Sequence, residues 1–345
     1  MQTGLPPLPL QSPGTPWPTR AWPTGEARAR DAARLEALLA RAFDAAPDGP
    51  LGKTYALLAI QGGRLTYERY GFGATPETTQ PSWSMAKSMT QALVGMLVLD
   101  GRLDIHAPAD VPEWKGADDP RAAITLDQLL RMSSGLAFVE DYVPGSVSDV
   151  LEMLYGSGKA DAAAYAASRP LAHPPGSFWS YASGTSNIVA RLAAQAQGGD
   201  FAAYMRSRLF EPLGMDSATP KFDAAGTFIG SSYCFCTPRD FARFGLLYLR
   251  DGAWDGRRLL PEGWVDYART PTFQQEGVTD GPYGAHWWLG IGGPGSFSAN
   301  GYAGQFIIVC PDRDLIVVRN GDTPLESKDR LRDWIGEVVD CFGAA

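Results

Sequence analysis

One stretch of the sequence, residues 81–101, constrains the fold more than any other. Pro81 and Ser82 predict the start of a helix, and Gly101 lies where the residue just past a helix end is expected. Between residues 93 and 99 the stretch is apolar almost all round, which is typical of a helix enclosed by other elements. The chain therefore needs further layers around this helix, and 345 residues are enough to build them.

The first turn of this expected helix carries Ser84 and Lys87. Residues three apart share a helix face, with Cβ atoms about 5–6 Å apart, so the hydroxyl and the amine point the same way. Burial would lower the pKa of such a lysine because desolvation disfavours its charged form. A lysine of that kind beside a serine is one way to activate a nucleophile. Ser-x-x-Lys is a short pattern that also arises by chance, but none of the other five lysines has a serine three residues before it.

The composition is that of an ordinary globular protein, with 45% apolar and 20% charged residues. A net charge of −8 without Lys/Arg clusters argues against nucleic acid and anionic membranes as partners. The four cysteines and three histidines lack zinc-site spacing, so we expect no metal and no cofactor. Residues 1–23 lack a secretory signal pattern and no later stretch is long and apolar enough to span a membrane, so we expect a cytoplasmic protein with free cysteines. The oligomeric state stays open, a homodimer included.

The order of predicted elements indicates a sheet interrupted by a helical segment. Residues 1–25 are expected to form an extended arm, residues 26–100 and 221–345 an α/β sheet domain, and residues 101–220 a helical insert, with the catalytic cleft between them. Two strands around Gly62-Gly63 predict a hairpin. The other expected elements are a helix from residue 26 towards 43, helices over 125–136, 147–155, 160–168, 184–197, 199–212, 238–251 and 326–342, and strands over 285–291, 306–310 and 315–319.

An acyl-transfer site also needs a group that relays protons. The settings of His106, His173 and His286 favour packing or capping over catalysis. Tyr181, in the segment Tyr181-Ala182-Ser183 ahead of a predicted helix, is the better candidate, because a nearby lysine ammonium would lower the pKa of its phenol. A packed tyrosine with Ser183 as a helix cap is the competing interpretation.

Taken together, these motifs resemble the penicillin-recognising serine hydrolases, the family that includes the class C β-lactamases. Ser84-Met85-Ala86-Lys87-Ser88 is similar to their Ser-x-x-Lys motif, and Tyr181-Ala182-Ser183 to their Tyr-x-Asn/Ser motif. Further matches at 129–135, 237–264, 283–288 and 301–305 extend the resemblance from about residue 50 to about residue 340. The chain most resembles the subgroup of 6-aminohexanoate-dimer hydrolases and family VIII carboxylesterases.

The resemblance implies an α+β fold of the β-lactamase/transpeptidase type, with an antiparallel sheet flanked by helices and an inserted, mostly helical domain. It also implies a serine hydrolase that forms an acyl-enzyme on Ser84, with protons handled by Lys87 and Tyr181. The oxyanion hole would be the backbone N–H groups of Ser84 and Tyr302. Which of Lys87 and Tyr181 is the primary base is left open.

For substrate binding, the resemblance implies roles for Tyr142, Ser183, Gly301 and Trp179. Two departures bear on the substrate: Ala299-Asn300-Gly301 offers no cation where β-lactamases have Lys-Thr-Gly, and residue 153 is Met, so no carboxylate is expected in the helix after the Tyr142 loop. We therefore expect a hydrolase of small amides or esters. The alternatives are a carboxylesterase with little amidase activity and a non-catalytic binding relative.

Overall fold

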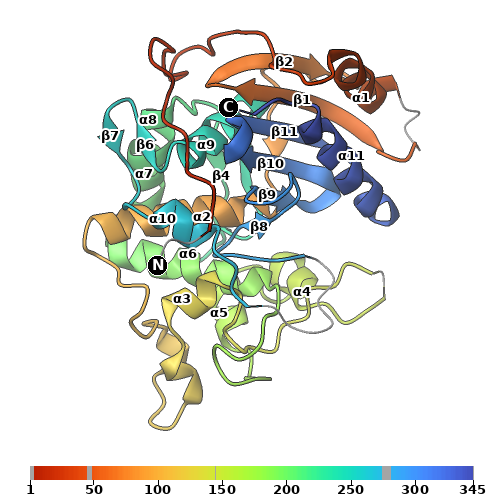
Figure 1. Ribbon diagram of the computed structural model, residues 1–345. Coiled ribbons are helices and arrows are strands. Elements are labelled where there is room, and N and C mark those ends of the chain that lie inside the picture. Colours follow the sequence, from red (N-terminus) through yellow and green to blue (C-terminus); the bar gives the residue numbers. More distant parts are fainter. Residues whose placement is uncertain (1–3, 45–48, 144, 274–280, 345) are drawn as a thin grey trace.

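A six-stranded antiparallel sheet is the frame of the molecule (Figure 1). The computed structural model describes residues 4–44, 49–143, 145–273 and 281–344. The strand order β2-β1-β11-β10-β9-β8 joins the first hairpin of the chain to its last strands through the β1–β11 pair. The strands are β1 Lys53–Gln61, β2 Arg64–Tyr70, β8 Trp288–Leu289, β9 Phe297–Gly301, β10 Gln305–Cys310 and β11 Leu315–Asp322.

The hairpin predicted around Gly62-Gly63 is confirmed. Both glycines have positive φ, at 62° and 75°, as a two-residue hairpin turn requires. Successive residues of β1 then face opposite sides of the sheet. Leu57 and Ala59 join one apolar cluster, whereas Leu58 and Ile60 join another, so the sheet is covered on both faces.

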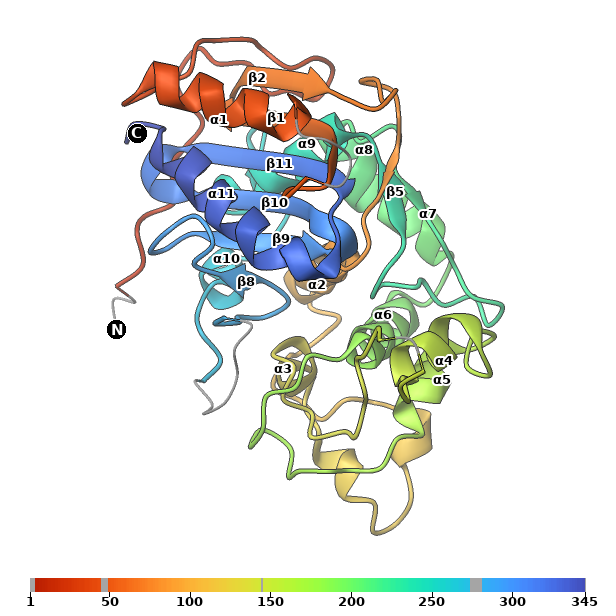
Figure 2. The same ribbon diagram turned by 90° about the vertical axis from the view of Figure 1, so that its right-hand side faces the viewer.

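Each face of the sheet is covered by helices. Helices α1 Ala32–Asp44 and α11 Lys328–Asp340 lie together on one face (Figure 2). Helices α2 Met85–Leu99 and α9 Pro238–Leu249 pack on the other. Residues 85–97 of α2 are all buried, which confirms that the segment opening the sequence analysis is an enclosed central helix.

The chain between α2 and β4 is mostly helical: α3, α4, α5 and α6 lie below the sheet in Figure 2, whereas α7 and α8 lie beside it. Its longest helix, α6, packs against α2 and so links the two parts. The domain boundaries given above remain a prediction. The helices here are η1 Pro112–Trp114, η2 Pro120–Ala123, α3 Leu126–Leu130, α4 Asp149–Tyr155, α5 Ala162–Ala167, α6 Ser183–Gln197, α7 Phe201–Met205, η3 Arg206–Phe210 and α8 Glu211–Leu213.

Short elements complete the fold around these two parts. Strand β5 pairs with β3 and β4 in a small sheet, and β6 pairs with β7. Their bounds, with those of the remaining helices, are β3 Gln80–Pro81, β4 Thr219–Pro220, β5 Cys234–Cys236, β6 Ala253–Trp254, β7 Arg257–Arg258, α10 Trp264–Ala268, η4 Tyr302–Gly304, η5 Pro311–Arg313 and η6 Leu325–Ser327.

Several predicted elements have other bounds because backbone turns interrupt them. The helix expected over 125–136 ends at Leu130, since Met132 adopts a φ of 57°. The strand expected over 285–291 shrinks to β8 between the positive φ values of His286 and Gly290. Pro81 belongs to strand β3 rather than to the start of α2. Strand β9 was not predicted.

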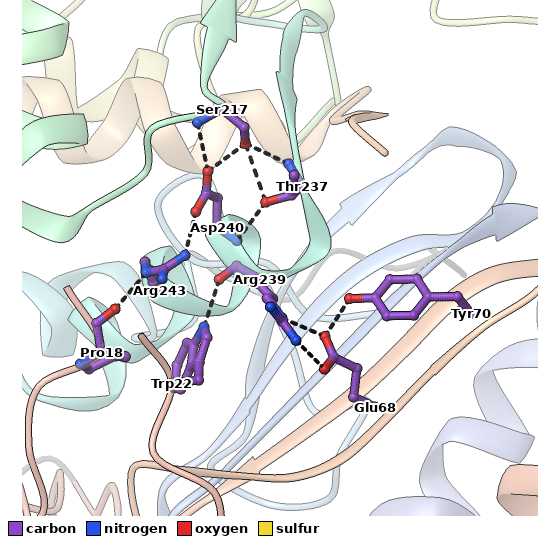
Figure 3. A network of polar contacts seen from close by, with 9 residues as sticks. All are labelled: Pro18, Trp22, Glu68, Tyr70, Ser217, Thr237, Arg239, Asp240 and Arg243. Carbon is purple, nitrogen blue, oxygen red and sulfur yellow. Dashed lines mark hydrogen bonds and ion pairs between the residues drawn. The ribbon is translucent and has the colours of Figure 1, made fainter. Parts of the chain in front are cut away.

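A polar network ties the N-terminal arm to α9 (Figure 3). Arg243 Nε donates to the carbonyl oxygen of Pro18 at 2.8 Å, and Trp22 Nε1 donates to that of Arg239 at 3.3 Å. The two arginines are themselves held by carboxylates: Arg243 pairs with Asp240 at 2.6 Å and Arg239 with Glu68 at 2.6 Å. These contacts hold Pro18, Trp22 and Glu68 against α9, although they are far from it in the sequence.

Candidate active site

Ser84 stands at the N-terminal end of α2, directly after a strained residue. Trp83 adopts a φ of 42°, which side-chain-bearing residues rarely adopt. Ser82 anchors the turn, because its Oγ accepts a hydrogen bond from the Cys234 N–H at 2.9 Å and donates to backbone carbonyl oxygens. Backbone strain of this kind is often found at functional sites. The turn fixes where Ser84 enters the helix.

Lys87 lies one helical turn further on and is buried, with 1% of its surface exposed. Its Nζ atom lies 3.0 Å from Ser84 Oγ, 3.0 Å from Ser183 Oγ and 2.9 Å from the carbonyl oxygen of Ser231. Burial lowers the pKa of Lys87 to about 8, against a smaller opposing effect of the Glu140 charge. The hydroxyl and the amine share a helix face, as the sequence predicts, and burial shifts the pKa of this lysine in the expected direction.

Tyr181 lies beside this pair. Lys87 Nζ is 4.9 Å from the centroid of its ring. The same ring packs against Trp288 at 5.2 Å and Tyr283 at 5.9 Å between centroids, and Trp179 joins this aromatic group through both of them. The structure thus brings together the hydroxyl, the amine and the phenol ring that the sequence suggested.

The end of strand β9 comes close to the segment that precedes Ser84. A Cβ atom on Gly301 would overlap the carbonyl oxygen of Ser82, so only glycine permits this approach. The next residue, Tyr302, packs its ring against Trp83 at 5.7 Å between centroids. The N–H of Ser84 lies at a helix start, where backbone donors lack intrahelical acceptors. An oxyanion hole needs two backbone donors beside the nucleophile, and this role of the Ser84 and Tyr302 N–H groups remains a prediction.

Tyr142 comes from the loop between α3 and α4 and contacts Tyr302 at the site. Its ring packs against Tyr302 at 5.3 Å between centroids. Its hydroxyl donates to Glu140 Oε1 at 2.8 Å, and burial together with this carboxylate raises the pKa of the phenol far above its ordinary value. Tyr142 is therefore a neutral hydrogen-bonding group at the site.

Ser183 is buried beside the site and does not line its cavity. The residue is 1% exposed, and its Oγ lies between Lys87 Nζ and Glu140 Oε1, which is 2.6 Å away. Its backbone N–H donates to Glu140 Oε2 at 2.7 Å. Ser183 therefore contacts the lysine, whereas the substrate-binding role expected for it remains a prediction.

A cavity of about 780 Å³ opens over these groups. Predicted site residues line it: Ser84, Tyr142, Trp179, Tyr181, Gly301 and Tyr302. Asn300 also lines it, and its Oδ1 is buried without a hydrogen-bond partner among the described residues. Lys328 and Arg332, from the first turns of α11, line the same cavity. Residues 299–301 carry no cation, but two cations thus line the cavity from α11, about 30 residues further along the chain.

Histidine takes no part in this cluster. His286 is buried, with Nδ1 2.6 Å from the Leu130 carbonyl oxygen and Nε2 2.9 Å from Ser186 Oγ, and burial lowers its pKa to about 3. His173 stacks on Phe178 at 3.8 Å between ring centroids, and His106 is exposed. Within the described ranges no cluster of three or more histidine, cysteine or acidic residues is arranged to hold a metal ion. Nor does any described helix combine the length and apolar character needed to cross a membrane.

Sequence reasoning missed Glu140 and the two cations of α11. Residue 153 is Met, so no carboxylate is expected in the helix after the Tyr142 loop, and Met153 is indeed buried against Asn187. The carboxylate that reaches the site comes instead from Glu140, two residues before Tyr142. Its only signal was its closeness in sequence to a predicted binding residue.

Comparisons with known proteins show which family the chain is similar to. The family model described as Beta-lactamase matches residues 39–340. A 6-aminohexanoate-dimer hydrolase of Paenarthrobacter ureafaciens is 27% identical over 323 residues, covering 88% of this chain and 80% of that protein. Esterase EstB of Burkholderia gladioli is 30% identical over 203 residues, 54% of this chain and 51% of its own.

The fold is also that of solved relatives. The crystal structure of a family VIII carboxylesterase superimposes with a TM-score of 0.68 at 14% identity, covering 91% of this chain and 99% of the other. The predicted β-lactamase/transpeptidase-like fold is therefore confirmed. With a family model that spans most of its length, the chain belongs to the β-lactamase family of serine hydrolases.

Proposed function

We propose that this protein hydrolyses small amides or esters through an acyl-enzyme on Ser84. Lys87, as the neutral amine, takes the proton of the Ser84 hydroxyl while Oγ attacks the substrate carbonyl carbon. The N–H groups of Ser84 and Tyr302 stabilise the negative oxygen of the tetrahedral intermediate, and losing one such donor typically reduces the rate about 10²–10³-fold. The leaving group departs with a proton, and water then releases the acyl group.

One observation supports the proposal above all others: a fully buried amine lies 3.0 Å from Ser84 Oγ. A pKa of about 8 leaves part of Lys87 unprotonated at neutral pH, which is the form that a general base requires. This favours Lys87 as the primary base. Tyr181, whose ring lies 4.9 Å from Nζ, would protonate the leaving group and activate the water.

The cavity supports a small, extended substrate. Aromatic rings of Trp179, Tyr181 and Trp288 form one wall, and Lys328 and Arg332 place positive charge on another. The relatives named above are a 6-aminohexanoate-dimer hydrolase and an esterase. We therefore expect linear amides and short-chain esters as substrates. In the same scheme Tyr142 would donate a hydrogen bond to the nitrogen of an amide substrate.

We further expect the protein to work in the cytoplasm, since its four cysteines are all free and buried. Separation of cell fractions with an antibody against the protein would test this. Recovery of the active protein outside the cytoplasm would contradict it.

The test is a panel of nitrophenyl esters, linear amides including ω-amino-acid oligomers, and a chromogenic cephalosporin. We expect a burst of nitrophenol from the wild type and covalent labelling by a fluorophosphonate, both lost in Ser84→Ala. Ser88→Ala is the matched control, because the Ser88 hydroxyl donates to the His286 carbonyl oxygen on the same helix and should leave labelling unchanged. Labelling that persists in Ser84→Ala, or a wild type without turnover or labelling, would contradict the proposal.

A further inference from the structure

Glu140 is the carboxylate that faces the catalytic cluster, although nothing in the motifs assigns it a function. Oε2 accepts the Ser183 N–H at 2.7 Å, while Oε1 accepts the hydroxyls of Ser183 and Tyr142 at 2.6 and 2.8 Å. An ionised carboxylate has no hydrogen to donate, so it can only accept hydrogen bonds. All three partners must therefore point their hydrogens at Glu140.

This arrangement fixes the direction of every hydrogen bond around the lysine. Because the Ser183 hydroxyl gives its hydrogen to Glu140, its oxygen can only accept from Lys87, 3.0 Å away. The carbonyl oxygen of Ser231, at 2.9 Å, can also only accept. A neutral amine has two N–H groups, and these two acceptors use both.

The lone pair of the neutral amine is then left for the third neighbour, Ser84 Oγ. We propose that Glu140 is a positioning residue for the reaction: by holding the Ser183 hydroxyl as an acceptor, it aims the lone pair of Lys87 at the nucleophile. This inference rests on the proposed function, because it needs Lys87 to act as the base. In the forward step the Ser84 proton moves to Nζ, and the resulting ammonium donates to Ser84, Ser183 and the Ser231 carbonyl oxygen.

Glutamine at position 140 cannot reproduce the pattern. It has one acceptor oxygen and one donor NH₂ where Glu140 has two acceptors. If the NH₂ group faces the Ser183 hydroxyl, that hydroxyl is free to donate to Lys87 and competes with Ser84 for the lone pair. If the NH₂ group faces the Ser183 N–H, two donors oppose each other. Either orientation disturbs the aim of the base.

The experiment measures the rate of fluorophosphonate labelling of Ser84 and kcat/KM for a nitrophenyl ester between pH 5.5 and 10. For Glu140→Gln we expect a plateau rate about 10–100-fold lower, part of the contribution of a general base. The acid limb should also move to lower pH, because removing the negative charge that raises the pKa of Lys87 makes the amine easier to deprotonate. A purely structural role would not move this limb.

Other titratable groups around Lys87 remain in place in this variant. Tyr181 lies just before α6, Tyr142 on the Glu140 loop, and Tyr283 and His286 on the segment before β8. Burial raises the pKa of Tyr283 and lowers that of His286, so neither changes charge between pH 6 and 9. A shift of the acid limb in Glu140→Gln thus comes from neither Tyr283 nor His286, and it is the shift expected for Lys87.

Glu152→Gln is the matched control. Its Oε2 also accepts a backbone N–H and a hydroxyl from one serine, Ser157, but on the exposed surface of α4. We expect its rate and pH profile to follow the wild type. If the pH–rate profile of Glu140→Gln has the same plateau and the same acid limb as that of Glu152→Gln, the inference is overturned.

A second variant keeps the test valid if Glu140→Gln does not fold. Ser183→Ala leaves Glu140 intact but removes the hydroxyl that links it to Lys87, and we expect a rate loss of the same order. Wild-type kinetics in Ser183→Ala would overturn this inference but would leave the proposed function unchanged. An unreactive Ser84 in the wild type would instead contradict the proposed function itself.

Discussion

The network of Figure 3 and the network around Lys87 differ in the groups that contact their cations. In the network of Figure 3, Arg243 pairs directly with Asp240 at 2.6 Å, and Arg239 with Glu68 at 2.6 Å. In the active site, the three neighbours of Lys87 Nζ are two hydroxyls and a carbonyl oxygen. The nearest carboxylate there, Glu140, is reached only through the Ser183 hydroxyl.

The difference separates structural cations from the lysine that we propose to be catalytic. A carboxylate in direct contact favours the charged form, and arginine stays protonated in any case. Lysine without that contact is dominated by desolvation, which lowers its pKa to about 8. The Ser183 hydroxyl lies between Lys87 and Glu140. At this separation the carboxylate stabilises the ammonium after proton transfer but does not keep the lysine permanently charged. The base remains titratable near neutral pH.

The largest effect should come from breaking the catalytic network at its cation. Lys87→Met removes the proposed base and should lower kcat/KM for esters at least about 10³-fold. The melting temperature at pH 7 should stay the same or rise. Because folding lowers the pKa of Lys87 from 10.5 to about 8, the folded state binds fewer protons than the unfolded state between these two pH values. The free energy of unfolding therefore rises with pH across this range, and below about pH 8 the buried lysine destabilises the folded state to its full extent. Activity near the wild-type level would contradict the assignment of the base.

The converse change breaks the structural network. Arg243→Met leaves Asp240 buried without its cation, since the two side chains are only 9% and 4% exposed. Removing one partner of a buried pair typically costs about 3–5 kcal/mol. We expect the free energy of unfolding in urea to fall by that amount, while kcat/KM per folded molecule stays within about twofold. A stable Arg243→Met protein with impaired turnover would reverse the roles given to the two networks.

A smaller change sharpens the catalytic side of the comparison. Tyr142→Phe removes one of the three donors to Glu140 and, in the proposed function, the donor to an amide nitrogen. We expect a loss of about tenfold on a linear amide, consistent with about 1.4 kcal/mol for one hydrogen bond, and about twofold on the matched ester. Measuring both substrates with one enzyme preparation tests this. Equal losses on the two would remove the amide-specific role.

The parts of the site that follow from local periodicity were predictable from the sequence. Ser84 and Lys87 share a helix turn, and the aromatic and glycine motifs at 181 and 301 lay in recognisable segments. The hydrogen bonds between Glu140 and Ser183 join residues 43 positions apart, from a loop to the start of a helix. No periodicity relates such residues, so only the folded chain shows their contact. The same holds for Lys328 and Arg332, which face the cavity from the closing helix.

The fold shows the same division. The hairpin at Gly62-Gly63 and the enclosed α2 were predicted because pattern and turn chemistry agree there. The shortened helix before Met132 and the shortened strand after His286 depend on positive φ values at residues with side chains. Tertiary contacts impose these turns: His286 N–H and Nδ1 both lie at the Leu130 carbonyl oxygen, and Ser180 N–H donates to the Met132 carbonyl oxygen.

The protonation of Lys87 can be observed directly. Lysines labelled with ¹³C at Cε give a titrating signal for each of the six side chains, and the signal missing from Lys87→Met identifies the active-site residue. An amine that is buried and kept one hydroxyl away from its carboxylate should titrate near pH 8. A midpoint at or above 10, the ordinary range of lysine, would show a permanently charged group and contradict its role as the base.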